Sequence, residues 1–293
     1  MTVSRVVNGS AAVSDSSRER VERAVAALGY QTDITARSLA TGRSGAVGVL
    51  SVEAPHYGPS STLAGIDSAA QALGISLTFI SVRQGDPASA RNALGRLVSM
   101  NVDGVIALAP VHSVVQQIRD LRIDRPLVLV SGGDDAPAPS VRIDQVVGAR
   151  AVVRHLLELG HSTVHHLRGP RGWLEADARH AAWRSELRAW GRTAPRPLVG
   201  DWTARSGYEQ GRRLAADDDV TAVFAANDQM ALGVLRSLAE VGREVPAQVS
   251  VAGFDDTPES AYYSPPLTTV RQDFAELGRE CVRVLHDLGG AGG

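Results

Sequence analysis

Few residues in this 293-residue sequence combine the types and the spacing that enzyme chemistry needs. His165 and His166 are adjacent on a predicted strand, so their side chains point to opposite faces and cannot ligate one metal ion. The segments SGG (131–133) and RGPRG (168–172) lack the spacing of a nucleophile elbow or a phosphate-binding loop. We therefore expect no enzyme, no catalytic residue, no metal ion and no cofactor.

A polar helical face lies at the very start of the chain. Valines recur there at spacings of three and four residues, as they do on one side of a helix, at Val3, Val6 and Val7. The remaining arc carries Thr2, Ser4, Arg5 and Asn8. Residues 1–44 hold six arginines against four carboxylates, although the whole chain has a net charge of −2. Positive charge is therefore concentrated at this end, and the chain as a whole is no general polyanion binder.

From residue 46 on, short β-branched runs alternate with longer amphipathic stretches. The predicted strands are 46–52, 75–82, 102–110 and 127–131 in a first series, and 163–169, 197–202, 221–227 and 249–254 in a second. Helical patterns lie between them at 87–100, 144–159, 175–190, 204–216 and 228–241. Strand followed by helix, repeated, predicts parallel sheets covered on both faces. The fold class is therefore α/β with two doubly wound lobes, whose ligands bind beyond the carboxyl ends of the strands.

Composition places the chain in the cytoplasm. A hydrophobic fraction of 44% with 21% charged residues is ordinary for a globular protein. There is no run of eighteen apolar residues and no basic-then-apolar leader, so we expect neither a membrane partner nor secretion. The one cysteine, Cys281, cannot form an internal disulfide, which fits a reducing compartment.

The region before residue 45 has a different pattern from the rest. Ser16 and Glu19 have the spacing of a capping box and predict a helix that ends at Gly29. The stretch DITARSLATGRS (33–44) is also able to form a helix. Isolated helices of about this length are marginal in water, so this one would form only against a partner.

Several segments, in one order along nearly the whole chain, resemble the LacI/GalR family of bacterial transcription regulators. They are TVSRVVNGS (2–10), RHLLELGH (154–161), GDWTARSGY (200–208), AANDQMALGVL (225–235), VSVAGFDDT (249–257) and PPLTTVRQDF (265–274). The resemblance implies a helix-turn-helix headpiece, a hinge, and an effector-binding core with two lobes like those of periplasmic binding proteins. The implied domains are 1–30 for a partial headpiece, 31–44 for the hinge helix and linker, 45–160 with 273–293 for the N-terminal lobe, and 161–272 for the C-terminal lobe.

The resemblance also implies DNA-binding residues. Thr2, Ser4, Arg5 and Asn8 would face the major groove from the latter part of a recognition helix. Ala36 and Leu39 belong to ARSL, which resembles the family's hinge helix, with Leu39 as an apolar wedge in the minor groove. The alternative is that Leu39 only anchors a linker on the N-terminal lobe.

Family members carry a further helix and turn before the recognition helix, and this sequence starts without them. We favour a start codon that lies further upstream, since a useless tail would hardly have kept its pattern. The alternative is a chain that lacks a complete DNA reader. The sequence also stops at HDLGGAGG, where relatives usually continue with another strand, whose loss would uncover apolar surface.

The ligand-binding residues that the resemblance implies lie in the cleft between the lobes: Tyr57, Pro59, Arg179, Trp202, Asn227, Gln229, Asp255, Gln272 and Phe274. Their chemistry suits a small sugar. Arg179 can donate to two adjacent hydroxyls, Asp255 accepts from hydroxyls, and the amides donate and accept. Trp202 offers a flat apolar face to a pyranose ring. Leu108 stands where a relative has a polar cleft residue, so we expect a more apolar wall in the N-terminal lobe.

Each of these residues also has a structural interpretation. Asn227 could cap the helix that follows it, and Asp255 could pair with Arg179 in the empty protein. Trp202 could belong to the core. Gln272 and Phe274 could form a hinge where the chain crosses between the lobes.

The predicted function is that of a sugar-responsive transcriptional regulator, expected to be a repressor of a carbohydrate-utilisation operon. Its partners would be operator DNA, a sugar effector and a second copy of the chain, with residues 59–74 at the dimer interface. No leucine heptads follow the core, which argues against a tetramer. The alternative function is a cytosolic sugar-binding protein with no role at DNA.

Overall fold

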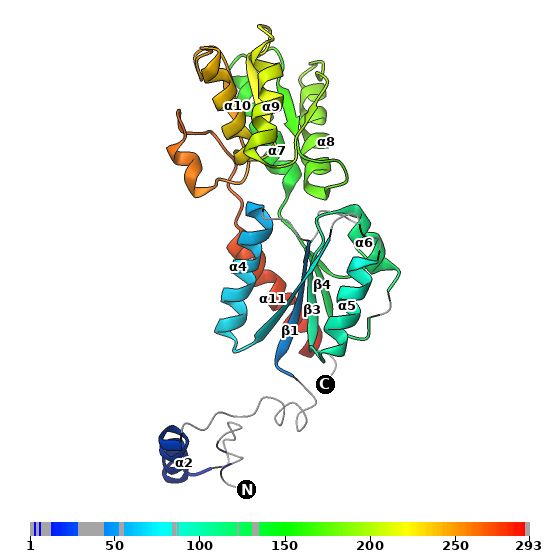
Figure 1. Cartoon of the computed structure of the whole chain (residues 1–293), viewed down its shortest axis with the longest axis vertical. Coiled ribbons are helices and arrows are strands. Elements are labelled where there is room, and N and C mark those ends of the chain that lie inside the picture. Colours follow the sequence, from blue (N-terminus) through cyan, green and yellow to red (C-terminus); the bar gives the residue numbers. More distant parts are fainter. Residues whose placement is uncertain are drawn as a thin grey trace.

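The computed structural model describes Val3, Val6 and residues 13–28, 44–52, 56–83, 86, 88–121, 123–130 and 135–290. Two α/β lobes follow one another along the longest axis of the molecule (Figure 1). Ahead of them lies helix α2 (Asp15–Leu28), which begins one residue before the predicted cap Ser16. The carbonyl of Ser14 accepts the amides of Ser17 and Arg18, which sets this earlier start. Within the described residues, no helix is long and apolar enough to cross a membrane.

The N-terminal lobe is built on a five-stranded parallel sheet with the order β2-β1-β3-β4-β5. Its strands are β1 (Ala46–Val52), β2 (Ser76–Val82), β3 (Gly104–Leu108), β4 (Leu127–Val130) and β5 (Ser140–Val141). Helices α4 (Tyr57–Ala72) and α11 (Phe274–Gly290) cover one face, and α5 (Ser89–Ser99) and α6 (His112–Arg119) cover the other (Figure 1). Strand β1 is buried along almost its whole length, which explains its continuous apolar run.

The C-terminal lobe has a four-stranded parallel sheet with the order β7-β6-β8-β9. Its strands are β6 (His165–Arg168), β7 (Leu198–Val199), β8 (Ala222–Ala225) and β9 (Ser250–Ala252). Helices α7 (Gln145–Glu158) and α8 (Leu174–Ala189) pack on one face, and α9 (Ala204–Ala215) and α10 (Asp228–Glu240) on the other. A short 3₁₀ helix, η1 (Pro258–Tyr262), follows β9. This confirms the predicted class of parallel sheets with helices on both faces.

Helix α7 does not lie where the predicted lobe boundary at residue 160 put it. Val153 and Leu156 of α7 share a buried cluster with Trp183 and Phe224 of the C-terminal lobe. The chain therefore crosses between the lobes just after β5, and α7 belongs to the C-terminal lobe. The pattern of α7 was correct, but an amphipathic helix does not reveal which of two sheets it covers. Strand β5 and helices α6 and α11 were not predicted as separate elements.

Glycines allow helices α9 and α10 to pack at short distance. A Cβ atom at Gly233 of α10 would overlap the carbonyl oxygen of Ala204 and the backbone of Gly207 and Tyr208 in α9. A side chain at Gly207 would likewise overlap the backbone of Met230. These glycines therefore set how closely this helix pair approaches and, through it, the position of the first turn of α10.

Gly233→Ala is expected to lower the free energy of unfolding by about 1–3 kcal/mol, because backbone cannot give way as a flexible side chain can. Gly95→Ala in α5 is the matched control, since a Cβ there meets nothing within 4 Å. It should raise stability by about 0.5–1 kcal/mol, as alanine favours a helix interior. Urea denaturation of both variants measures the difference; equal effects would contradict the close packing.

Candidate functional site

A cavity of about 790 Å³, measured with its open mouth, lies between the two lobes. Leu108 and Val130 reach it from the carboxyl ends of β3 and β4, and Asn227 and Asp255 from just beyond β8 and β9. Both segments that cross between the lobes also line it, one through Arg142, Ile143 and Gln145 and the other through Gln272 and Phe274. The cavity therefore lies where parallel sheets place their ligands.

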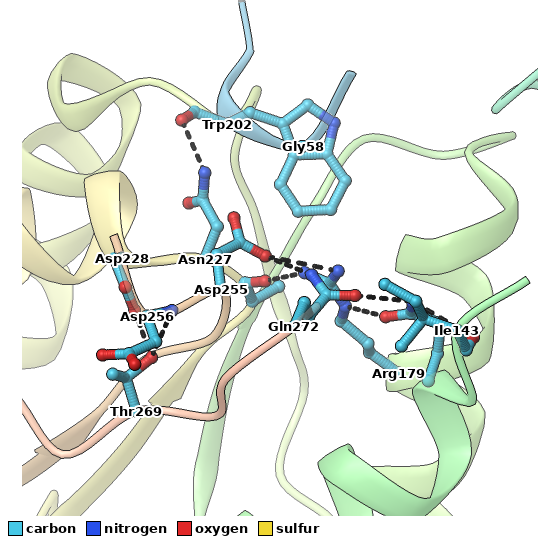
Figure 2. A network of polar contacts seen from close by, with 12 residues as sticks. Gly58, Ile143, Arg179, Trp202, Asn227, Asp228, Asp255, Asp256, Thr269 and Gln272 are labelled. Carbon is cyan, nitrogen blue, oxygen red and sulfur yellow. Dashed lines mark hydrogen bonds and ion pairs between the residues drawn. The ribbon is translucent and has the colours of Figure 1, made fainter. Parts of the chain in front are cut away.

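Arg179 is the centre of a polar network in the wall of the cavity (Figure 2). Its side chain is only 4% exposed. The Nε–H group donates to Oε1 of Gln145 at 2.8 Å, and the guanidinium also donates to the carbonyl of Ala226. One terminal nitrogen lies 3.6 Å from Oδ1 of Asp255. The guanidinium lies over the ring of Phe254, 3.9 Å from its centre, which adds a cation–π contact.

Two glutamines connect this network to both crossing segments. Gln272 donates through Nε2 to Oδ1 of Asp255 at 2.6 Å. Gln145 donates through Nε2 to Oε1 of Gln272 at 2.8 Å. Since Gln145 also accepts from Arg179, the four side chains form a closed ring of contacts. The ring supports the structural interpretation of the Arg179–Asp255 pair, and it holds the two crossing segments together.

Burial governs the ionisation of the Arg179–Asp255 pair. Removal from water raises the pKa of Asp255 to about 7, while the neighbouring Arg179 opposes that rise. Burial also lowers the pKa of Arg179, and the nearby carboxylates oppose that fall. Asp255 therefore gains or loses its proton close to neutral pH.

Asn227 has the capping role and a place in the cavity wall at once. Its Oδ1 accepts from the amide of Met230 at 3.0 Å and so caps α10. Its Nδ2 donates to the carbonyl of Trp202 at 3.0 Å and to Oε1 of Gln229 at 2.8 Å. Gln229 itself does not line the cavity, although it was predicted to bind the ligand. Gln229 comes two residues after Asn227, and its side chain bonds to that of Asn227 instead.

Trp202 is held rigidly at the cavity by its backbone and its neighbours. Its φ of 74° is unusual for a residue with a side chain. The indole ring packs so closely on Gly169 that a Cβ there would overlap it. Trp173 meets it edge to face, with ring centres 5.7 Å apart. Trp202 is thus partly core, as one interpretation held, and also lines the cavity.

The wall from the N-terminal lobe and α11 is mostly apolar. Tyr57 and Phe274 contact each other edge to face, with ring centres 5.7 Å apart, and Pro59 lies beside them. Leu108 is 3% exposed and faces the same space. This is the apolar wall that Leu108 indicated in the sequence.

Some cavity residues were not predicted. Trp173 lies just before α8, and Glu175 lies in its first turn. Glu175 is four residues before Arg179 on the same helical face. That spacing was visible in the sequence. Gln145 and His56 gave no such signal, since each reaches the cavity from the residue where its helix begins or just before it.

The predicted DNA-binding residues lie outside the described residues. They are Thr2, Ser4, Arg5, Asn8, Ala36 and Leu39. In the part of the chain that the structure describes, no group of three or more His, Cys, Asp or Glu residues could hold a metal ion. The polar network and the cavity are therefore the candidate functional features of the described residues.

Comparison with known proteins identifies the family. Residues 1–33 match the bacterial regulatory proteins of the lacI family, and residues 153–292 match the periplasmic binding protein-like domain. The lactose operon repressor of Escherichia coli (strain K12) is 36% identical, over 98% of this chain and 80% of that protein. The chain belongs to the lacI family of bacterial regulatory proteins. A second relative of this regulator, CelR of Thermobifida fusca, is 34% identical over 98% of the chain and 87% of that protein.

Solved structures agree with the assignment of this lacI-family regulator. A lac repressor dimer bound to operator and the anti-inducer ONPF has a TM-score of 0.90 at 35% identity, over 99% of this chain and 88% of that chain. A CelR–cellobiose complex has a TM-score of 0.76 at 30% identity, over 98% and 88%. The regulator is thus a ligand-responsive, DNA-binding protein of this family.

The stability of the regulator is expected to depend on pH through Asp255. The folded chain holds a proton on Asp255 between its ordinary pKa of 3.8 and about 7, where the unfolded chain has lost it. The contribution of the Asp255 proton to the free energy of unfolding is therefore complete below pH 3.8 and is lost as the pH rises through about 7. Relative to Asp255→Asn, the unfolding free energy of the parent should fall by about 3 kcal/mol between pH 5 and pH 8.

Chemical denaturation at four pH values between 5 and 8 measures this. The exposed Asp218→Asn change is the control, since it removes the same charge at the surface of the same lobe. A difference between parent and Asp255→Asn that stays constant over this range would contradict a protonated, buried Asp255.

Proposed function

We propose that this regulator is a repressor of a carbohydrate-utilisation operon and that a sugar effector binds in the interlobe cavity. The observation that carries the proposal is the buried Arg179–Asp255 pair at the carboxyl ends of the strands, beside the buried indole of Trp202. A cationic donor next to a carboxyl acceptor matches neighbouring sugar hydroxyls, each of which both donates and accepts.

The apolar groups of the cavity complement the rest of a sugar. Trp202, Tyr57 and Phe274 offer ring faces and edges for the C–H surface of a pyranose. Asn227 keeps its amide at the wall while it caps α10. Pro59 and Gln272 complete the set that we propose to contact the effector. Gln229 would act through Asn227, whose amide it accepts.

The cavity is placed to change how the lobes lie against one another. The two crossing segments line it, and beside it the amide of Leu174 donates to Pro110 and that of His112 donates to Gly172 between the lobes. An effector that binds better to one arrangement of the lobes shifts the population towards that arrangement. At the far end of the N-terminal lobe, the carboxylate of Asp103 accepts the amides of Ser44 and Gly45, at 2.8 Å each. Movement of the lobe would thereby reach the segment that precedes residue 44.

The relatives support the remaining parts of the proposal. The lac repressor structure is a dimer bound to operator, and the CelR structure holds cellobiose. We infer a cytoplasmic homodimer that is no enzyme, with α4 at the dimer interface. Thr2, Ser4, Arg5 and Asn8 would read the operator, and Ala36 and Leu39 would form the hinge helix. The match of residues 1–33 to the lacI family argues against a sugar-binding protein without a DNA role.

Arg179→Ala is expected to weaken the response to sugar while DNA binding remains. Loss of a charged donor in the pocket should weaken sugar binding at least about tenfold. The full-length regulator would be titrated onto its own upstream promoter DNA at low salt, with and without lactose, cellobiose, D-galactose and D-glucose. Arg188→Ala, an exposed arginine on the same helix, is the control and should behave like the parent.

Two results would count against this function. If the parent fails to retard its promoter DNA at low salt, the chain is no DNA-binding regulator of that promoter. If Arg179→Ala responds to sugar as the parent does, the effector binds elsewhere.

A further inference from the structure

Glu175 lies in the cavity wall, in the first turn of α8. It stands one helical turn before Arg179, and the side chains of both residues face the cavity. Trp173, just before the helix, lines the same part of the wall and packs on Trp202. The ring of contacts around Arg179 does not include Glu175.

The protein leaves one oxygen of this carboxyl without a partner. Among the described residues, Oε2 of Glu175 is buried and has no hydrogen-bond partner. Of the buried polar atoms in that condition, only this oxygen and Nε1 of Trp202 belong to residues that line the cavity. Arg179, Asp255, Gln272 and Gln145 bond to one another, and Asn227 bonds to Trp202, Gln229 and Met230. The wall therefore offers a ligand one acceptor and one donor that nothing else in the described protein uses.

A buried polar group without a partner is unfavourable, so a ligand that satisfies it gains affinity and selectivity. The indole N–H only donates, and an ionised carboxylate only accepts. A hydroxyl can serve either group because it donates and accepts. An ammonium is a poorer fit, since the guanidinium of Arg179 lies one turn from Glu175. Burial raises the pKa of Glu175 against the influence of Arg179, so a partner that needs no charge on the carboxyl suits it better.

We propose that Glu175 is a specificity-determining residue that hydrogen-bonds one particular hydroxyl of the bound sugar. This proposal rests on the proposed function, because it places the sugar in the interlobe cavity. It assigns to Glu175 the choice between sugars that differ at that one hydroxyl, while Arg179 and Asp255 hold the sugar as a whole.

The test compares variants on one sugar and its deoxy analogues. Lactose, cellobiose, D-galactose and D-glucose are first ranked by the rise they cause in the melting temperature of the full chain. Calorimetric titration with the top-ranked sugar and its monodeoxy series then gives dissociation constants for the parent, Glu175→Ala, Glu175→Gln and Arg179→Ala. Glu209→Ala, an exposed glutamate in α9, is the control.

The expected result is a loss of affinity of about tenfold or more in Glu175→Ala, and a smaller loss in Glu175→Gln, whose amide oxygen still accepts. One monodeoxy analogue should bind the parent and Glu175→Ala equally, because the hydroxyl that Glu175 contacts is already absent. A merely structural role would weaken all analogues alike and would overturn the proposal.

Three further outcomes would overturn this proposal, and the first of them leaves the proposed function intact. If Glu175→Ala binds every sugar like the parent while Arg179→Ala loses binding, Glu175 has no such role and the sugar site stands. If neither variant changes binding, the sugar lies elsewhere and both proposals fail. If no sugar of the panel raises the melting temperature of the parent, the panel excludes these sugars as effectors and both proposals fail.

Discussion

The cost of burying the guanidinium of Arg179 is the constraint on which the rest of this structure depends. A buried cation must be paired and hydrogen-bonded, and here its partners come from separate parts of the chain. Asp255 follows β9, the Ala226 carbonyl follows β8, and Gln145 begins α7. These groups meet because the carboxyl ends of parallel strands share one edge of the sheet. The groups that pair with the buried guanidinium therefore also form part of the cavity wall.

This wall also joins the lobes. Gln145 and Gln272 lie on the two crossing segments and bond to each other and to the Arg179–Asp255 pair. A molecule that competes for these donors and acceptors necessarily acts on the crossings as well. The polar network thus gives a physical reason why occupation of the cavity would change the arrangement of the lobes, without a separate relay between distant sites.

Much of the fold could be predicted from sequence because buried parallel strands have continuous β-branched runs. All eight predicted strands are present, most of them shorter at the ends than predicted. Strand β5 has only two residues, too few for a pattern, and α7 could have covered either sheet. The family resemblance placed Arg179, Trp202, Asn227 and Asp255 at the cavity, and all four line it. Gln229 does not line it, because its position two residues after Asn227 turns its side chain to Asn227. Burial of one oxygen of Glu175 depends on packing that no spacing rule reveals.

The most direct test of the account is a crystal structure of the chain with the sugar that stabilises it most. We expect sugar hydroxyls within hydrogen-bond distance of the Arg179 guanidinium and the Asp255 carboxyl, with the ring against Trp202. Sugar bound in another cavity, which lies at the opposite end of the N-terminal lobe between Gly74, Asp103 and Leu285, would contradict this expectation. So would an interlobe cavity in which Arg179 and Asp255 contact only each other and the two glutamines.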